Sequence, residues 1–367
     1  RAYFAFVASS RWFATRMDIL SFTLMAVASF FAVLFNDQNW FKVDPSVLGL
    51  TLTLLIQIAG TNFPWIVRQS AEVVNQMTSV ERILEFGALE SEASLKLDSD
   101  KHITSWPNNG SIEVQDLSIR YRPDLPLALE GATFCIPAGT RIGVVGRTGS
   151  GKSTLVQAFF RLLEAEHGSI LIDGIDISNV GLHILRGNIS VIPQTPTLFS
   201  GCTLRENLDL FGLHSDEDIQ RTLEDVHLHK TIMELPLGVN TIISDEGTNF
   251  SVGERQLLCL ARANLKKCKI LVLDEATASV DKDTDHLLHA SLDAAYENAT
   301  IIKIAHRLDS VIGDDYILVL GSGKVVEFGT PAELLQAKAA FYRMVTDTNM
   351  SSELTARANA KYKKKVN

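Results

Sequence analysis

The sequence predicts an α/β domain preceded by an all-α pair of transmembrane helices. Two observations carry this prediction. The apolar run Ile142–Val145 leads into a glycine-rich turn and then a helix-forming stretch, and apolar runs alternate with helical stretches to about Val345. Upstream, two long apolar segments, Ile19 through Phe35 and Val47 through Val67, are separated by a short polar loop.

The glycine-rich turn fits the pattern G-x-x-x-x-G-K-[ST], which is the pattern of a phosphate-binding loop, or P-loop. Its backbone N–H groups can surround a polyphosphate, Lys152 can reach the β and γ phosphates, and the Ser153 hydroxyl can ligate Mg²⁺. A simple turn before a helix is the alternative, but the preceding strand and the following helix favour nucleotide binding. The residues assigned to the nucleotide are Gly146, Arg147, Thr148, Gly149, Ser150, Gly151, Lys152, Ser153 and Thr154.

A second apolar run, Ile270–Leu273, ends in Asp274 and Glu275, as expected of a buried strand that delivers acids to the phosphate end. We expect Asp274 to hold Mg²⁺ through water and Glu275 to polarise the attacking water. Two adjacent acids also occur in exposed turns. Together with the P-loop, however, they favour hydrolysis over binding alone.

Between these motifs lies Asn249–Gln256, in which Ser251 and Gly253 stand at the start of a helix and offer a hydroxyl and free N–H groups to an anion. Alone this is an ordinary capped helix. Upstream of Asp274, it resembles the signature of ATP-binding cassette (ABC) proteins, with Phe250-Ser251-Val252-Gly253-Glu254 where the family usually has L-S-G-G-Q.

Further motifs follow the order of that family. The resemblance implies that Gln194 contacts Mg²⁺ and the attacking water, that residues 277–281 form the D-loop, that His306 contacts the γ-phosphate, and that adenine stacks on Tyr121. It also implies the fold of an α/β P-loop NTPase, an ABC ATPase domain with a mixed sheet and a helical subdomain. ATP and Mg²⁺ are the expected cofactors.

The two apolar segments predict spans at about 18–36 and 46–67, although a buried core helix is the alternative for the shorter one. The arginines lie outside the hairpin and the acids in its loop, so both outer ends should face the cytoplasm. The residues concerned are Arg1, Arg11, Arg16, Arg68 and Arg82 outside, and Asp37, Lys42 and Asp44 in the loop. The second helix should continue past the lipid bilayer to about Leu84, with an apolar stripe that packs on partner helices.

Ser70-Ala71-Glu72 and Ser79–Ile83, together with Phe250–Gly253, resemble the C subfamily of ABC transporters, the multidrug-resistance-associated proteins. The resemblance implies a carboxy-terminal fragment, with which the absence of an initial Met agrees. It comprises the end of the membrane domain (1–89), a linker (90–109), the second nucleotide domain (110–345) and a polar and basic tail (346–367) containing Lys361–Lys365. The implied partners are the first nucleotide domain and the remaining transmembrane helices of the same transporter.

In that family each nucleotide site is shared between two domains. The resemblance implies that one half of a hydrolytic site comes from this chain, and that its signature residues Ser251, Gly253 and Glu254 serve the other site. Glu254 departs from the usual glutamine, and a carboxylate beside a triphosphate is repulsive, which puts the affinity of that second site in question.

The expected substrate is an amphipathic organic anion such as a glutathione conjugate. Arg11 with Trp12, and Trp65 with Arg68, resemble positions that line the family's substrate pocket, where the cations would pair with carboxylates and the indoles would stack. Interfacial anchoring explains the same pairs. An ATP-gated channel or a channel-regulating subunit of the subfamily is the alternative function. A soluble ABC-type ATPase is disfavoured by the two spans, and the net charge of −9 argues against nucleic acid as a partner.

Overall fold

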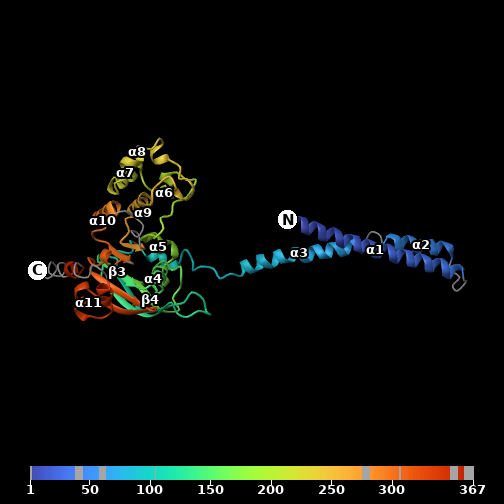
Figure 1. Cartoon of the computed structure of the whole chain (residues 1–367), viewed down its shortest axis with the longest axis horizontal. Helices are drawn as coiled ribbons and strands as arrows, with labels where there is room; N and C mark the ends of the chain where they lie inside the picture. Colours follow the sequence, from blue (N-terminus) through green and yellow to red (C-terminus); the bar gives the residue numbers. More distant parts are fainter. Residues whose placement is uncertain are drawn as a thin grey trace. The chain divides into compact units, whose positions relative to one another are not determined.

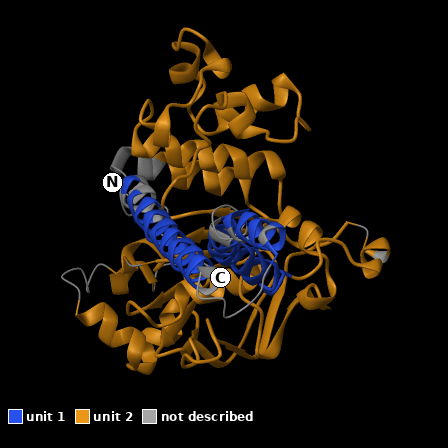
Figure 2. Cartoon of the chain, turned by 90° about the vertical axis from the view of Figure 1, so that its right-hand side faces the viewer, with its two compact units in different colours: residues 1–92 blue, residues 93–367 orange. Residues whose placement is uncertain are grey.

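The computed structural model describes residues 2–37, 44–57, 63–103, 105–274, 282–305, 307–347 and 354–358. They divide into two compact units, Arg1–Glu92 and Ala93–Asn367, which are coloured separately in Figure 2.

Unit 1 is helical throughout its described residues and contains α1 (Ala2–Asp37), α2 (Pro45–Gln57) and α3 (Phe63–Gly87). Within α1, Arg11–Leu34 is the only helix of the described residues that is long and apolar enough to cross a membrane. The first predicted span lies in this helix. The second predicted span is divided between α2 and the start of α3, and because residues 58–62 lie outside the described residues, it stays a prediction.

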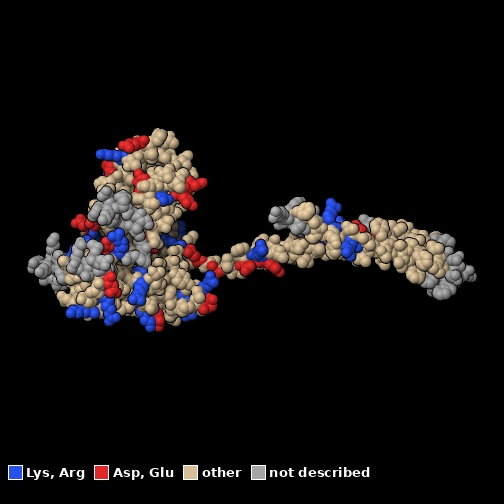
Figure 3. Space-filling view, in the orientation of Figure 1, with Lys and Arg blue, Asp and Glu red and all other residues tan. Residues whose placement is uncertain are grey.

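Unit 1 has an exposed apolar surface. The described apolar residues of α1 and α2 are mostly exposed, and Figure 3 shows few charges on the face of these two helices that it presents. The helix α3 extends to Gly87, slightly beyond its predicted end at about Leu84, and its apolar stripe is exposed at Val73, Val74, Met77, Val80, Ile83 and Leu84. Such a surface suits a lipid or protein environment better than water.

Unit 2 contains a six-stranded sheet with the order β10 (Lys324–Gly329), β9 (Tyr316–Gly321), β3 (Arg141–Gly146), β8 (Thr300–Ile304), β7 (Ile270–Asp274) and β6 (Ile189–Ile192). The strands β9, β3, β8, β7 and β6 run parallel, and β10 pairs antiparallel with β9 at the edge. The apolar runs form these strands because both faces of a parallel sheet are covered. The first four residues of β7 are accordingly buried.

A second, antiparallel sheet has the order β2 (Leu129–Ile136), β1 (Ile112–Ile119), β4 (His167–Ile172) and β5 (Ile175–Asp176). The helices are α4 (Lys152–Phe159), α5 (Leu182–Asn188), α6 (Leu204–Leu208), α7 (Asp216–Asp225), α8 (His229–Met233), α9 (Val252–Lys266), α10 (Lys282–Ala295), α11 (Pro331–Ala337) and α12 (Ala340–Thr346). Figure 1 shows α6, α7 and α8 grouped at one end of unit 2, beyond α9. The expected mixed sheet and helical subdomain are therefore both present.

The predicted linker differs from the structure. The boundary between the units lies after Glu92, so most of residues 90–109 belong to unit 2. Trp106 is buried, and its Nε1 donates to the Ile172 carbonyl at 2.9 Å. The Asp173 carboxylate accepts bonds from the N–H groups of the adjoining residues 109–111. The polar composition suggested a linker, but a tryptophan and satisfied N–H groups hold the segment against the domain.

The predicted tail also begins later than expected. Leu354 and Ala358 are buried in the same apolar cluster as Phe341 and Val345, so packing of the domain extends beyond residue 345. The basic residues Lys361–Lys365 lie outside the described residues.

Candidate functional site

The P-loop lies between β3 and α4, as its sequence predicts. The strand β3 ends at Gly146, and α4 begins at Lys152 after the N-cap Gly151. Gly151 has φ of 100°, and a Cβ there would lie 2.7 Å from the Leu129 side chain and 2.9 Å from the Ala128 carbonyl oxygen. Only glycine suits this position, because both the conformation and the space exclude a side chain.

The ammonium group of Lys152 is held within the loop. The residue is 5% exposed, and its Nζ donates to the carbonyl oxygens of Gly146 at 2.8 Å and Arg147 at 3.1 Å. A desolvated cation interacts more strongly with an anion than a solvated one does. The loop therefore presents a preoriented positive charge.

A cavity of about 590 Å³ lies over the loop. The Tyr121 hydroxyl is 3.0 Å from Thr154 Oγ1 at its wall, and nearly half of Tyr121 is exposed, so the ring is free to stack. The cavity is lined by Tyr121, Leu127, Ala128, Thr148, Gly149, Gly151, Lys152, Ser153, Thr154, Ser322 and Gly323. Ser322 and Gly323, from the β9–β10 turn, were not predicted, and nothing in their local sequence distinguishes them from any other turn.

The donor set fits a nucleoside triphosphate. The Ser150 hydroxyl oxygen beside the lysine is buried with no hydrogen-bond partner among the described residues. A cation, hydroxyl groups and backbone N–H groups are what phosphate oxygens require. No cluster of three His, Cys, Asp or Glu side chains that could hold a metal occurs in the described part of the chain. The oxygen donors that could hold a magnesium ion beside a bound nucleotide are those of Ser153, Gln194 and Asp274.

The register of the sheet brings the other motifs to the same edge. Ile304 pairs with Val144 of β3 on one side and with Asp274 on the other, so Asp274 lies near the end of β3 that carries the P-loop. The strand β6 is parallel to β7, and Gln194 follows it by two residues. Glu275, His306 and the D-loop residues 277–281 lie outside the described residues, so their roles stay predictions.

Gln256 was not recognised from the sequence. It is almost fully buried on α9, and its Nε2 donates to the Gln194 carbonyl at 3.2 Å. The bond fixes the backbone at Gln194 to α9. A glutamine within a predicted helix carries no signal for such a contact.

The signature begins α9 with a reciprocal capping box. The Glu254 N–H donates to Ser251 Oγ at 3.2 Å, and the Glu254 carboxylate accepts from the Ser251 N–H at 2.7 Å. The glutamate at this position thus has a structural function, since S-x-x-E is a typical helix start. No described residue of α9 lines the P-loop cavity.

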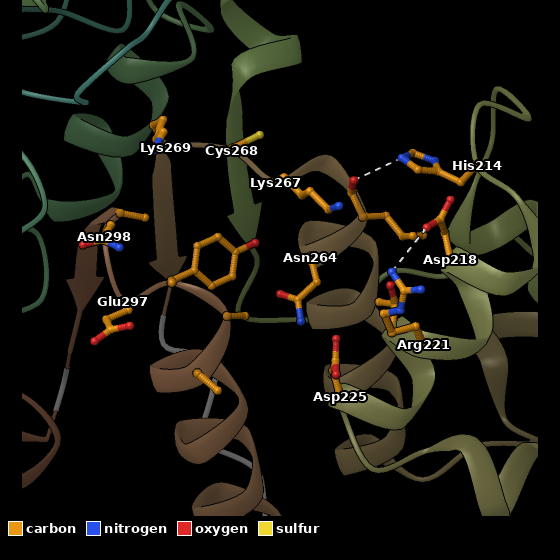
Figure 4. A pocket seen from close by; sticks show the side chains of 16 residues that line it. His214, Asp218, Arg221, Asp225, Asn264, Lys267, Cys268, Lys269, Glu297 and Asn298 are labelled. Carbon is orange, nitrogen blue, oxygen red and sulfur yellow. Dashed lines mark hydrogen bonds and ion pairs between the residues drawn. The ribbon is translucent and has the colours of Figure 1, made fainter.

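A separate cavity of about 550 Å³ lies between α7, the end of α9 and the segment after α10 (Figure 4). His214 Nε2 lies 3.1 Å from the Leu265 carbonyl oxygen at its rim. Burial raises the pKa of the Tyr296 phenol well above its ordinary value. This cavity shares no lining residue with the P-loop cavity.

The predicted substrate residues lie in unit 1. Arg11 is on α1, Trp65 and Arg68 are on α3, and all three are exposed. The guanidinium of Arg16 covers the ring of Trp12, 5.0 Å from its centroid. One helical turn separates Arg16 from Trp12, whereas adjacent residues diverge around a helix.

Comparisons with known proteins agree with this geometry. The ABC transporter family matches residues 129–278. ATP-binding cassette sub-family C member 3 of Rattus norvegicus is 40% identical over 348 residues, covering 95% of this chain and 22% of that protein. ABC transporter C family member 13 of Oryza sativa subsp. indica is 42% identical over 353 residues, covering 96% of this chain and 23% of that protein.

Among solved structures, a bacterial Atm1-family ABC exporter with ATP bound matches with a TM-score of 0.65 and 28% identity, covering 81% of this chain and 51% of that one. The chain spans less than a quarter of the length of the two curated relatives. Sequence motifs, sheet order and these similarities lead to one assignment. The chain belongs to the ABC transporter family and, within it, to the C subfamily.

Proposed function

We propose that the chain is the ATP-hydrolysing half of an exporter that moves amphipathic organic anions across a membrane. The observation that carries the proposal is the buried Lys152 ammonium, held between two P-loop carbonyls at the sheet edge that also carries Asp274. A loop of this geometry suits a triphosphate, and an acid beside it suits magnesium.

Each side chain then has a defined task. Lys152 would neutralise the β and γ phosphates, and Ser153, Gln194 and Asp274 would orient a magnesium ion, which lowers the negative charge that develops on the transferred phosphoryl group. Glu275 would accept a proton from the attacking water, and His306 would contact the γ-phosphate. Tyr121 would stack on adenine.

The site as proposed is completed by a second nucleotide domain, and the signature residues of this chain serve the other site. The absence of α9 residues from the described lining of the P-loop cavity supports this arrangement. The length of the relatives also supports it, because they leave room for a first nucleotide domain and further transmembrane helices. The nucleotide domain would lie in the cytoplasm, where ATP is available.

The substrate class rests on Arg11, Trp65 and Arg68. An exposed cation near an apolar helix is costly in a bilayer unless it faces the protein interior or an aqueous path. A guanidinium beside an indole suits a ligand with a carboxylate and an apolar body, such as a glutathione conjugate.

The test is ATP-dependent uptake of labelled dinitrophenyl-glutathione into inside-out vesicles that contain the full-length transporter. Glu275→Gln should abolish uptake, whereas Glu234→Gln, a change at an exposed position after α8, should leave it unchanged. Hydrolysis without uptake would contradict the substrate class and favour other substrates or a channel-regulating role. Absence of ATP hydrolysis would contradict the proposed function itself.

A further inference from the structure

The chain enters unit 2 through a segment that is fastened to α5. Residues 94–100, here called the strap, accept hydrogen bonds from the first N–H groups of that helix. The bonds are Gly181 N–H to Asp100 Oδ1 at 2.9 Å, Leu182 N–H to the Ser94 carbonyl at 3.3 Å and His183 N–H to the Leu95 carbonyl at 3.0 Å. Because helix N-termini leave these donors without intrahelical partners, the strap serves as the cap of α5.

Asp100 holds the strap in shape as well. Its Oδ2 accepts the Leu97 N–H at 2.8 Å, and Ser99 Oγ donates to the Asn179 carbonyl at 2.8 Å. The N–H groups of Leu97 and Gly181 lower the pKa of the Asp100 carboxyl below its ordinary value. The carboxylate therefore joins the strap to α5 in its charged form.

Gly181 is needed only because the strap lies so close. Its φ of −63° and ψ of 141° are open to any residue. A Cβ at this position, however, would lie 2.3 Å from Asp100 Oδ2 and 2.8 Å from the Leu95 carbonyl oxygen. An alanine would fit α5 and expel the strap.

Two buried or half-buried arginines connect the same region to the P-loop helix. Arg161, which follows α4 and is 9% exposed, donates through Nη1 to the carbonyls of Ile177 and Val180, both at 3.0 Å. Arg186 on α5 donates to the carbonyls of Phe160 at 3.0 Å and Arg161 at 3.1 Å. Contacts therefore run without a break from the strap to the end of α4, whose first residues are Lys152 and Ser153.

The helix α5 is also followed directly by β6, and β6 ends two residues before Gln194. We infer that Asp100 and Gly181 are positioning residues that couple the chain entering the nucleotide domain to α4 and to the Gln194 segment. A flexible linker would not transmit a displacement of the entering chain. A strap that is hydrogen-bonded to three consecutive N–H groups transmits the displacement to α5. The inference rests on the proposed function, since coupling is defined here between the strap and bound nucleotide.

Hydrogen exchange measured by mass spectrometry tests this inference on the full-length transporter in lipid nanodiscs, with Glu275→Gln to prevent hydrolysis. In this background MgATP should slow exchange both in the P-loop peptide around 146–154 and in the peptides that contain the strap and residues 179–185. Asp100→Ala and Gly181→Ala should each raise exchange at 179–185 about tenfold without nucleotide, as expected when protecting bonds are lost. Both should also abolish the response of the strap to MgATP.

Two matched substitutions serve as controls. Asp98→Asn changes an exposed strap carboxylate whose one hydrogen-bond partner among the described residues is Lys101. Gly187→Ala adds a methyl group to α5 at a position where no described atom beyond the neighbouring residues and the helix's own backbone lies within 4 Å. Neither should alter the strap's exchange or its response. A strap that is merely structural would exchange at the same rate with and without MgATP while MgATP still protects the P-loop. This result would overturn the inference and leave the proposed function standing. If MgATP fails to protect the P-loop, the proposed function fails with it.

Discussion

Lys152→Met should remove most of the nucleotide affinity of this chain. The ammonium is 5% exposed, and it is held by two carbonyl oxygens at the mouth of the cavity. Opposite unit charges about 4 Å apart attract by roughly 4 kcal/mol at an effective dielectric constant near 20. A loss of about 2.7 kcal/mol, or a hundredfold in Kd, is a conservative expectation.

Thermal unfolding with ATP measures this loss. At an ATP concentration of about 100 times the wild-type Kd, binding stabilises the native state by roughly 2.7 kcal/mol, which corresponds to about 5–10 °C in Tm. The same ATP concentration would be about equal to the Kd of the variant, so binding would stabilise its native state by roughly 0.4 kcal/mol and raise its Tm by about 1 °C. Lys230→Met, a change at an exposed lysine on α8, should keep the full shift. A Lys152→Met variant that retains more than half of the wild-type shift would refute the reasoning.

Three further predictions concern other groups. Tyr121→Ala should raise the Kd for ATP about tenfold in equilibrium binding, because stacking on an aromatic ring is worth about 1–3 kcal/mol, whereas Tyr121→Phe should change it less than about threefold; equal losses would exclude stacking. Ser251→Ala should lower the free energy of unfolding by about 1 kcal/mol, and Glu254→Gln by less, since glutamine can still accept the Ser251 N–H; a larger loss for Glu254→Gln would argue against the capping box. Burial opposes ionisation of Asp173, but the N–H groups of residues 109–111 outweigh it and hold its pKa below the ordinary value. Its stabilisation is therefore present above the unfolded-state pKa and lost as pH falls through the folded-state pKa. Asp173→Asn should lower the free energy of unfolding by about 2 kcal/mol at pH 7, and the difference in Tm between the variant and the wild type should narrow below about pH 4. A difference in Tm that does not depend on pH would contradict this assignment.

Local chemistry explains why much of the site could be predicted. Gly151 needs a left-handed conformation, Lys152 must stand one residue inside the helix, and both requirements are met within a few residues of chain. The buried strand that ends at Asp274 was predicted correctly because a continuous apolar run is typical of a buried parallel strand, and parallel strands end at one edge of a sheet. The S-x-x-E pattern of Ser251 and Glu254 also predicts a helix cap. The charge of Glu254 was instead interpreted as repulsion of a bound triphosphate.

Other features depend on residues that are distant in the sequence. Asp100 and Gly181 are separated by 81 positions, and Gln256 reaches the Gln194 carbonyl across 62. Composition assigned Asp100 to a linker, because a short polar stretch looks the same whether its groups bond to water or to a helix end. Part of the lining of the P-loop cavity, Ser322 and Gly323, comes from a turn that local sequence cannot distinguish from others.

The sequence alone determined the fold class, the P-loop, the position of the signature and an apolar helix long enough to span a membrane, because each depends on residue type and short-range spacing. The tertiary structure decided how the entering chain is fastened to α5, which side chains close the cavity and which partner covers Trp12. These contacts depend on which surfaces the folded sheets and helices bring together. A hydrogen bond or a close glycine contact between distant residues contributes free energy only once folding has brought those residues together.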